Sequence, residues 1–367
     1  MRSPRFFLVQ DDKILRLTQV LLDPNVNAER FRAFEDFVST DVPDFKAWIA
    51  DFRKRTQTLF PSEVHMVKSV PEFHELLAKA DHVFIESFAF GAKEIALATR
   101  LKSVHQFGLH TDHIDLQACQ HASIPVHTVR RLTNIAVAEH TLMLCLNLAR
   151  RFSFVNGLIR SSDLKKAGLP YRPYDLSQTA NANYGRIPSL TTLHGKTLGL
   201  LGFGEIAKEV ANLAQAFGMK ILCHRRTPLS ADEQNQFQVQ SVDFKSLLRQ
   251  SHFLSIHLPL HAATQNLINA KALALMPKGA YLVNTARAAI VEHEALRAAL
   301  ADQHLAGAAF DVHYQEPASE DESLLALPNF ISTPHMSGTS RVNNLSDVES
   351  MIRPCLMHPN TQSNRHL

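Results

Sequence analysis

The chain has 367 residues, of which 45% are hydrophobic and 20% charged, and its formal net charge is +3. This size indicates two domains or one large one with an ample core, and the lack of a long basic run argues against nucleic-acid binding. We expect no membrane contact either, because no apolar run approaches the ~18 residues of a membrane span.

Two features of the sequence bear on the compartment. The apolar stretch within Met1–Val9 is too short for a signal peptide. The cysteines form no Cys-x-x-Cys pair, so neither a disulfide framework nor a metal site is indicated. We therefore expect a cytoplasmic protein. The four cysteines are Cys119, Cys145, Cys223 and Cys355.

The first part of the chain, residues 1–128, alternates between strand-like and helical patterns. Such alternation predicts a parallel α/β sheet, which we assign to a first domain. Strands are expected at Phe6–Val9, Ile14–Leu22, Glu63–Val67, His82–Ile85, Lys102–Phe107 and Ile124–His127. Helices are expected at Ala28–Val38, Asp44–Leu59, Pro71–Ala80, Lys93–Arg100 and Leu116–Ala122.

The second part, residues 129–333, starts with a long apolar helix at Thr133–Arg151 and an irregular surface segment at Ser161–Thr192. Further alternation predicts a second doubly wound sheet. Strands are expected at Leu198–Leu201, Met219–His224, His252–His257, Ala280–Asn284, Gly307–Phe310 and Phe330–Ser332, and helices from Glu205, at Asn269–Met276 and at Glu292–Ala301. Residues 334–367 form a tail with one helix, Ser346–Leu356.

The stretch Leu198–Val210 has the pattern of a dinucleotide-binding strand, turn and helix. Gly202 makes the turn, Gly204 lets the backbone approach a pyrophosphate, and Ala207 keeps the helix close to the strand. The unpaired N–H groups at the start of the helix favour phosphate. The cofactor-binding residues expected here are Gly202, Gly204, Glu205 and Ile206.

The residues after the second strand of this domain indicate which nicotinamide cofactor is used. NAD-preferring folds place an acidic residue there, which binds the ribose hydroxyls. This chain has Arg225 at that position, followed by Arg226. A guanidinium can instead bind a 2′-phosphate by charge-assisted hydrogen bonds. We therefore expect NADP to be preferred, with NAD possible.

Polar residues follow three neighbouring strands of the second sheet, where open α/β sheets bind ligands. Arg287 follows one strand, Asp311 and Glu316 the next, and His335 the last. Arginine binds carboxylates through two parallel hydrogen bonds. Histidine transfers protons near neutral pH, and a neighbouring carboxylate favours its charged form. The set predicts proton-transfer chemistry on an acid substrate.

These motifs resemble the D-isomer-specific 2-hydroxyacid dehydrogenase family, which includes glyoxylate and hydroxypyruvate reductases and phosphoglycerate dehydrogenase. The resemblance runs from about Leu101 to Gly338. It implies hydride transfer between a nicotinamide and C2 of a 2-oxo or 2-hydroxy acid of the D-isomer. The segments that carry it are residues 108–115, 134–141, 198–210, 257–259, 283–287, 311–317 and 333–335.

The resemblance also implies roles for the site residues. Arg287 would hold the substrate carboxylate, His335 would be the acid/base, and Glu316 would orient and charge His335. The loop at Gly108 and Leu109 would offer backbone N–H groups to the carboxylate. Further cofactor contacts are implied at His257, Pro259, Thr285, Ala286, Asp311 and Gly338, beside Arg225 and Arg226.

The family architecture would be a Rossmann coenzyme domain inserted into a flavodoxin-like substrate domain, with the site in the cleft and a homodimer formed through the coenzyme domain. The chain departs from the pattern at several positions. His110 replaces a glycine, and its ring either fills part of the pocket or points away. Arg130 and Arg131 replace a Pro-Gly turn, and meet either a second anionic group of the substrate or solvent. Ala288 and Ala289 replace two glycines.

Two rival functions remain open from the sequence. A nicotinamide-sensing binding protein, like the co-repressors of this family, can retain Arg287, Glu316 and His335. Formate dehydrogenases of the family carry glutamine at the position of Glu316, so the glutamate argues against formate oxidation.

Overall fold

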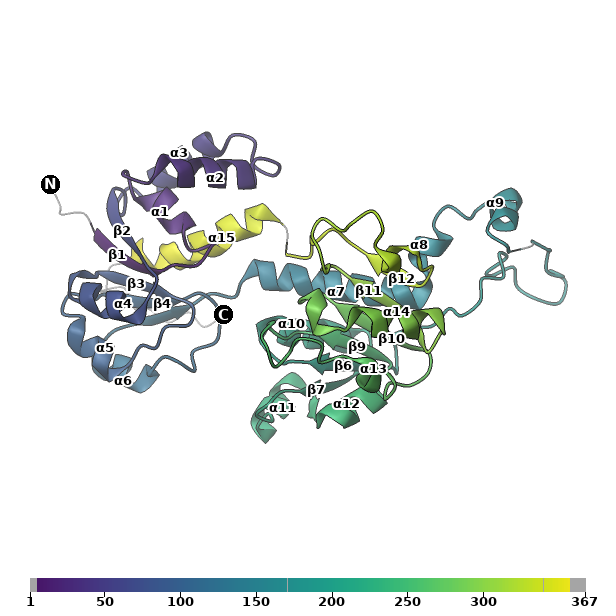
Figure 1. The fold of residues 1–367 in the computed structure, drawn as a ribbon. Helices are drawn as coiled ribbons and strands as arrows, with labels where there is room; N and C mark the ends of the chain where they lie inside the picture. Colours follow the sequence, from purple (N-terminus) through teal and green to yellow (C-terminus); the bar gives the residue numbers. More distant parts are fainter. Residues whose placement is uncertain (1–4, 170, 339, 357–367) are drawn as a thin grey trace. The chain divides into compact units, whose positions relative to one another are not determined.

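The structure, a computed structural model, describes residues 5–169, 171–338 and 340–356 (Figure 1). The chain forms two compact units. Unit 1 contains the described residues up to Asn134 together with the C-terminal segment, and unit 2 contains Ile135–Gly338. The sequence places the boundaries after residues 128 and 333, whereas the structure has them after 134 and 338.

Unit 1 is built on a five-stranded sheet in the order β2-β1-β3-β4-β5, with every pair parallel. This is the order of the flavodoxin-like doubly wound fold. Its elements are β1 (Arg5–Gln10), α1 (Leu17–Leu22), α2 (Ala28–Val38), α3 (Phe45–Arg55), β2 (Ser62–Val67), α4 (Val70–Leu76), η1 (Leu77–Lys79), β3 (His82–Ile85), α5 (Ala92–Leu97), β4 (Ser103–Gln106), α6 (Leu116–His121), β5 (Val126–Thr128), α15 (Arg341–Ile352) and η4 (Arg353–Leu356).

One expected strand of unit 1 is wrong. The apolar run Ile14–Leu22 contains the helix α1 rather than a strand. Leu17, Val20 and Leu21 recur at helical spacing and are buried. A short apolar run is compatible with a buried strand or a buried helix, and here the helical face packs into the core beside α15.

Unit 2 is built on a seven-stranded parallel sheet in the order β12-β11-β10-β9-β6-β7-β8. Counted from β6, this is the Rossmann order with one added strand. Its elements are α7 (Leu132–Arg150, which begins in unit 1), α8 (Phe152–Val155), α9 (Ser161–Lys166), β6 (Thr197–Leu201), α10 (Glu205–Ala216), β7 (Lys220–His224), α11 (Ala231–Phe237), β8 (Gln240–Ser241), α12 (Phe244–Gln250), β9 (Phe253–Ile256), α13 (Ala270–Leu273), β10 (Ala280–Asn284), η2 (Ala288–Ile290), α14 (His293–Ala301), β11 (Leu305–Phe310), η3 (Ser323–Ala326) and β12 (Phe330–Ser332).

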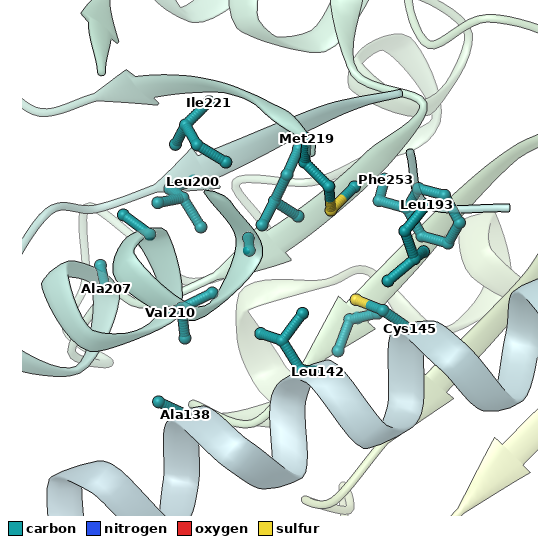
Figure 2. Close-up of a cluster of buried hydrophobic side chains, with 14 of the residues drawn as sticks. Ala138, Leu142, Cys145, Leu193, Leu200, Ala207, Val210, Met219, Ile221 and Phe253 are labelled. Atoms are coloured by element: carbon teal, nitrogen blue, oxygen red, sulfur yellow. The ribbon is translucent and has the colours of Figure 1, made fainter. Parts of the chain in front are cut away.

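Helix α7 has the length and hydropathy of a membrane span, and half of that window is buried in the fold. Figure 2 shows why it is apolar: Ala138, Leu142 and Cys145 face a cluster that includes Val210 of α10 and Leu200 of β6. This cluster fixes α10 against the strand that leads into the glycine turn. The apolar character of α7 is therefore explained by core packing.

The segment expected to be irregular, Ser161–Thr192, is irregular in its described part except at its start. There Ser161–Lys166 form the short helix α9. Leu164 is its buried residue. A helix of this length has too few apolar residues to show a periodic pattern.

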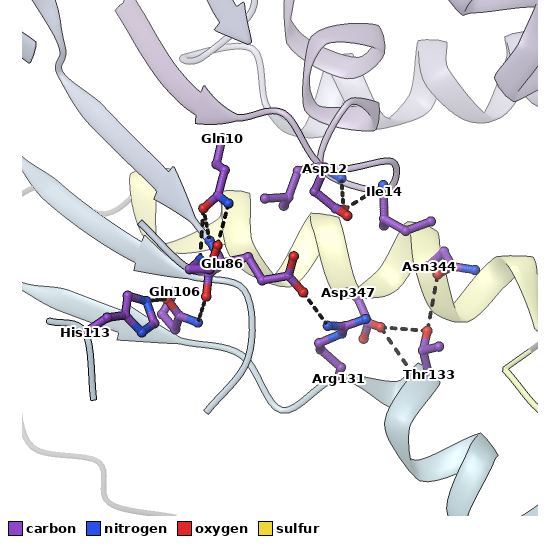
Figure 3. A network of polar contacts seen from close by, with 12 residues as sticks. Gln10, Asp12, Ile14, Glu86, Gln106, His113, Arg131, Thr133, Asn344 and Asp347 are labelled. Atoms are coloured by element: carbon purple, nitrogen blue, oxygen red, sulfur yellow. Dashed lines mark hydrogen bonds and ion pairs between the residues drawn. The ribbon is translucent and has the colours of Figure 1, made fainter. Parts of the chain in front are cut away.

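A buried carboxylate ties the C-terminal helix of unit 1 to the start of α7 (Figure 3). Asp347 of α15 accepts hydrogen bonds from the backbone N–H of Leu132 at 2.7 Å and of Thr133 at 3.3 Å, and from Thr133 Oγ1 at 3.0 Å. The first N–H groups of a helix have no partner within the helix. Asp347 therefore both satisfies these donors and places its charge at the positive end of α7.

Replacing Asp347 with alanine should destabilise unit 1 by about 1–3 kcal/mol, because buried donors lose their acceptor. The single tryptophan of the chain, Trp48, lies in α3 of unit 1. Its fluorescence during urea unfolding therefore reports on this unit. The exposed Ser350 of the same helix provides the control, and Ser350→Ala should leave the midpoint within about 0.5 kcal/mol of wild type. Equal midpoints for both variants would contradict this role of Asp347.

Candidate active site

The polar residues expected to act together lie at one edge of the unit 2 sheet. β10, β11 and β12 are adjacent and parallel, so their carboxyl ends meet at the same edge. Arg287 follows β10, Glu316 follows β11, and His335 follows β12. Among the described residues, Arg287 makes no hydrogen bond to Glu316 or His335, whereas those two contact each other directly.

Glu316 and His335 form a close pair. Nδ1 of His335 lies 2.7 Å from Oε2 of Glu316, and both side chains are about half-exposed, at 46% and 40%. The second carboxylate oxygen accepts a hydrogen bond from the His313 amide at 3.0 Å. Burial alone would raise the pKa of Glu316, but the bonds from His335 and His313 lower it overall. The carboxylate is therefore held ionised beside the imidazole, whose Nε2 points to the opposite side of the ring.

Asp311 holds the loop that carries His335. This carboxylate is fully buried and accepts hydrogen bonds from Thr333 Oγ1 at 2.6 Å, the Met336 amide at 2.9 Å and the Ser337 amide at 2.8 Å. Burial would raise its pKa, but these bonds lower it. His335 lies between the bonded residues, with φ at +51°. A non-glycine residue in this region is strained by about 1–3 kcal/mol, so the surrounding bonds must hold it there.

Arg287 is exposed, and its Nη1 donates to the carbonyl oxygen of Ala286 at 2.6 Å. Asn284, which is fully buried, braces the turn beneath it. Its Oδ1 accepts from the Ala286 amide, and its Nδ2 donates to the Arg287 carbonyl. The sequence analysis did not single out Asn284, although it stands within residues 283–287. A buried amide directly before a turn is the signal that could have revealed this role.

The two glycines of the dinucleotide turn have different reasons to be glycine. Gly202 has φ +96°, and a Cβ there would lie 2.3 Å from the carbonyl oxygen of His257. Gly204 has an ordinary extended backbone, and a Cβ there would meet nothing within 4 Å. The fold requires the first glycine. The open space at Gly204 fits a close approach of a ligand to the backbone, as dinucleotide binding needs.

Around this turn the structure supplies what a dinucleotide needs. Gly204 is the N-cap of α10, and Glu205 and Ile206 form its first turn. Ala207 is fully buried, as the close helix–strand packing requires. The backbone N–H groups at the start of α10 can bind a pyrophosphate.

The residues after β7 are basic, as the sequence indicates. Arg225 is partly exposed, and its Nη1 lies 4.0 Å from Oε1 of Glu233. Arg226 is exposed. The Glu233 carboxylate belongs to the capping box of α11. Arg225 thus has a weak internal partner in Glu233.

The remaining expected cofactor residues surround the same sheet edge. His257 Nε2 lies 2.8 Å from Ser255 Oγ, and burial lowers the pKa of His257 to about 4, so the ring is neutral. Thr285 Oγ1 lies 3.1 Å from Thr141 Oγ1 of α7. Pro259 is exposed, and Gly338 follows the Asp311-bound loop.

Several of the residues of unit 1 that were expected to contact the substrate interact with other residues of the chain. The Gly108 amide donates to the Gln106 carbonyl at 3.0 Å, so it already has a partner, while Leu109 is 48% exposed. His110 Nδ1 lies 3.5 Å from Asp112 Oδ2. Arg131 is not simply solvated: it stacks on Phe107 at 4.2 Å and pairs with Glu86 at 3.4 Å, as Figure 3 shows for the Glu86 contact.

Comparison with known proteins agrees with this geometry. The model of the D-isomer specific 2-hydroxyacid dehydrogenase NAD binding domain matches residues 142–337. The chain is 34% identical over 243 residues to a glyoxylate reductase of Thermococcus litoralis, which spans 66% of this chain and 69% of that one. The chain belongs to the D-isomer specific 2-hydroxyacid dehydrogenase family. It is therefore a nicotinamide-dependent oxidoreductase.

Other members of the family are also similar. The chain is 30% identical over 279 residues to a chloroplastic/mitochondrial formate dehydrogenase of Arabidopsis thaliana, covering 76% of this chain and 67% of that one. The crystal structure of apo D-mandelate dehydrogenase from Rhodotorula graminis superposes with a TM-score of 0.54 at 23% identity, covering 95% of this chain and 92% of that one. This confirms the two-domain α/β fold of the dehydrogenase family.

The two turn glycines should respond differently to the same substitution. Gly202→Ala should destabilise unit 2 by more than about 1 kcal/mol, because its Cβ meets backbone and its φ is positive. Gly204→Ala should leave thermal unfolding unchanged and weaken binding of the nicotinamide cofactor by at least about 10-fold, which is ~1.4 kcal/mol. Calorimetry and cofactor titration measure both. Unchanged affinity in Gly204→Ala would refute a close backbone approach there.

Proposed function

We propose that the protein reduces 2-oxo acids to D-2-hydroxy acids with NADPH. The Glu316–His335 pair carries this proposal, because an ionised carboxylate 2.7 Å from an imidazole favours the protonated ring that can act as an acid. When bound, the nicotinamide would supply the hydride to the substrate C2.

The chain's own residues would do the rest. His335 would donate a proton from Nε2 to the carbonyl oxygen, while Glu316 keeps Nδ1 protonated and fixes the ring. Arg287 would leave its contact with the Ala286 carbonyl and bind the substrate carboxylate through its planar fork. Asp311 would hold His335 at a fixed position, which limits the reorganisation needed in the transition state.

Unit 1 would contribute backbone N–H groups of the Gly108–Leu109 loop to the carboxylate. The Gly108 amide would then have to exchange its partner, the Gln106 carbonyl, for substrate.

A formate oxidase fits less well. Formate oxidation yields carbon dioxide and leaves no alkoxide for an acid to protonate, so a charged Glu316–His335 pair would have no task. A nicotinamide-sensing binding protein would keep its function without His335, whereas a reductase would lose its turnover. The His335→Asn variant therefore distinguishes the two functions.

The preference for NADPH rests on Arg225 and Arg226. Arg225 is partly exposed and its contact with Glu233 is only 4.0 Å, so the guanidinium can turn to a 2′-phosphate. An acid in this position would repel that phosphate. Arg226 is exposed and adds a second positive charge.

We also propose a cytoplasmic homodimer. Exposed apolar side chains lie on and beyond the end of α7, among them Met143, Phe152 and Phe154, which is a surface suited to a second copy. All four cysteines are unpaired and buried, which suits a reducing compartment. Sedimentation equilibrium measures whether the protein is a dimer.

His335→Asn should lower kcat for glyoxylate or hydroxypyruvate reduction by at least about 100-fold, the usual scale for removing a general acid. Cofactor affinity should stay close to wild type. His121→Asn, at an exposed histidine of α6, is the control. Steady-state kinetics over a panel of 2-oxo acids decides the matter. Near wild-type turnover in His335→Asn would exclude this histidine as the acid.

Glu316→Gln should move the alkaline limb of the reduction profile to lower pH. The Glu316 carboxylate has a lowered pKa and is charged throughout the working range. Its charge favours the protonated ring of His335, so neutral glutamine removes that support and the acid form is lost at a lower pH. A pH profile of kcat/KM measures the shift. An unmoved limb would remove Glu316 from the mechanism.

The wild type should use NADPH at least about 10-fold better than NADH in kcat/KM, a difference of ~1.4 kcal/mol. Arg225→Asp should narrow or reverse this ratio, and Glu233→Ala should increase it by freeing Arg225. Arg249→Asp, in the last turn of α12, is a charge-matched control. Equal or better use of NADH by the wild type would contradict the proposed preference.

A further inference from the structure

A cluster of polar side chains is buried in unit 1, apart from the residues of the candidate active site. His82 and His105 stand on neighbouring strands β3 and β4 and are 3% and 1% exposed. Ser103 Oγ lies between them, 2.8 Å from His82 Nδ1 and 2.7 Å from His105 Nε2. The rings pack against Phe7 and Phe84, and the His105 ring also packs against His127.

The C-terminal segment of unit 1 adds a thiol to this cluster. Cys355 of η4 is 3% exposed, and its Sγ lies 3.3 Å from His105 Nε2. The ligand atoms of His82, His105 and Cys355 all lie within 4.8 Å of one another. Metal–nitrogen and metal–sulfur bonds of ~2.0 and ~2.3 Å bring donor atoms to within about 4 Å of each other. A small adjustment of the side chains would close the set around one ion.

The hydrogen bonds of the cluster are incomplete. Nε2 of His82 and Nδ1 of His105 are buried without a hydrogen-bond partner in the described chain. The two nitrogens that face Ser103 are paired, because its hydroxyl can donate to one ring and accept the N–H of the other. Buried polar groups are normally paired, and unpaired ones call for an explanation such as an ion.

We propose that His82, His105 and Cys355 form a three-coordinate site for Cu(I). Neutral imidazoles and a thiolate are donors that suit copper, and thiolates in particular favour Cu(I). Charge decides between ions of similar affinity. One monovalent cation with one thiolate is neutral, whereas a divalent ion would leave a net positive charge in an apolar core that already feels Arg5 and Lys102.

Binding releases one proton: the Cys355 thiol loses its hydrogen as the copper–sulfur bond forms, and no electron is transferred. A thiol binds a metal as the thiolate, so the ion itself drives this deprotonation. The bound ion would connect β3, β4 and η4. It would therefore anchor the C-terminal segment of unit 1 to the sheet.

The direct test is anaerobic titration of the reduced, metal-free full-length protein with Cu(I) against a colorimetric Cu(I) chelator. We expect one equivalent to bind, X-ray absorption to show two nitrogen neighbours and one sulfur, and Trp48 fluorescence to report later unfolding of unit 1 in urea. The spectroscopic result needs no variant. No retained copper, or a site with two or more sulfurs, would overturn the proposal.

Variants locate the site. Cys355→Ser should weaken Cu(I) binding by at least about 100-fold, more than the ~10–100-fold lost with a second-shell partner. Cys119→Ser is the matched control, since Cys119 is also buried in unit 1 but lies outside the cluster. Equal loss in both variants, equal retention in both, or one tightly bound Zn(II) with no competing Cu(I) would each overturn the assignment.

Discussion

The buried carboxylate of Asp311 is the interaction on which the candidate active site depends. It lies at the end of β11 and binds the backbone of the loop after β12, so two neighbouring strands share one anchor. His335 is held in a left-handed conformation by bonds on both sides of it. Without them the loop would relax and the imidazole would leave the carboxylate of Glu316.

The parallel sheet of unit 2 explains why a few residues are enough to form the candidate active site. Because all strands run in one direction, every chemistry-bearing side chain follows a strand end at the same edge. The glycine turn after β6 and the loops after β10, β11 and β12 therefore converge without long insertions. Asn284 and Asp311 are both buried, and their hydrogen bonds hold these loops in place.

Much of the fold could be predicted from the sequence. β3, β10 and β12 have the expected bounds, because short apolar runs flanked by turns identify parallel strands well. The helix α1 was mistaken for a strand, since a short apolar run fits a buried strand as well as a buried helix. The anchoring role of Asp311 was not visible, because its partners lie 22–26 residues further along. The cluster at Cys355 was hidden for the same reason: Cys355 follows His105 by 250 residues.

The split of unit 1 has a consequence for how the protein is made. α15 and η4 pack against an apolar face of the unit 1 sheet, which includes Phe7, Phe84 and Val64. These last two elements are synthesised only after residues 135–338. The first sheet must therefore wait with this face uncovered while unit 2 folds, and in that interval it is the part of the nascent chain most exposed to chaperones and to aggregation.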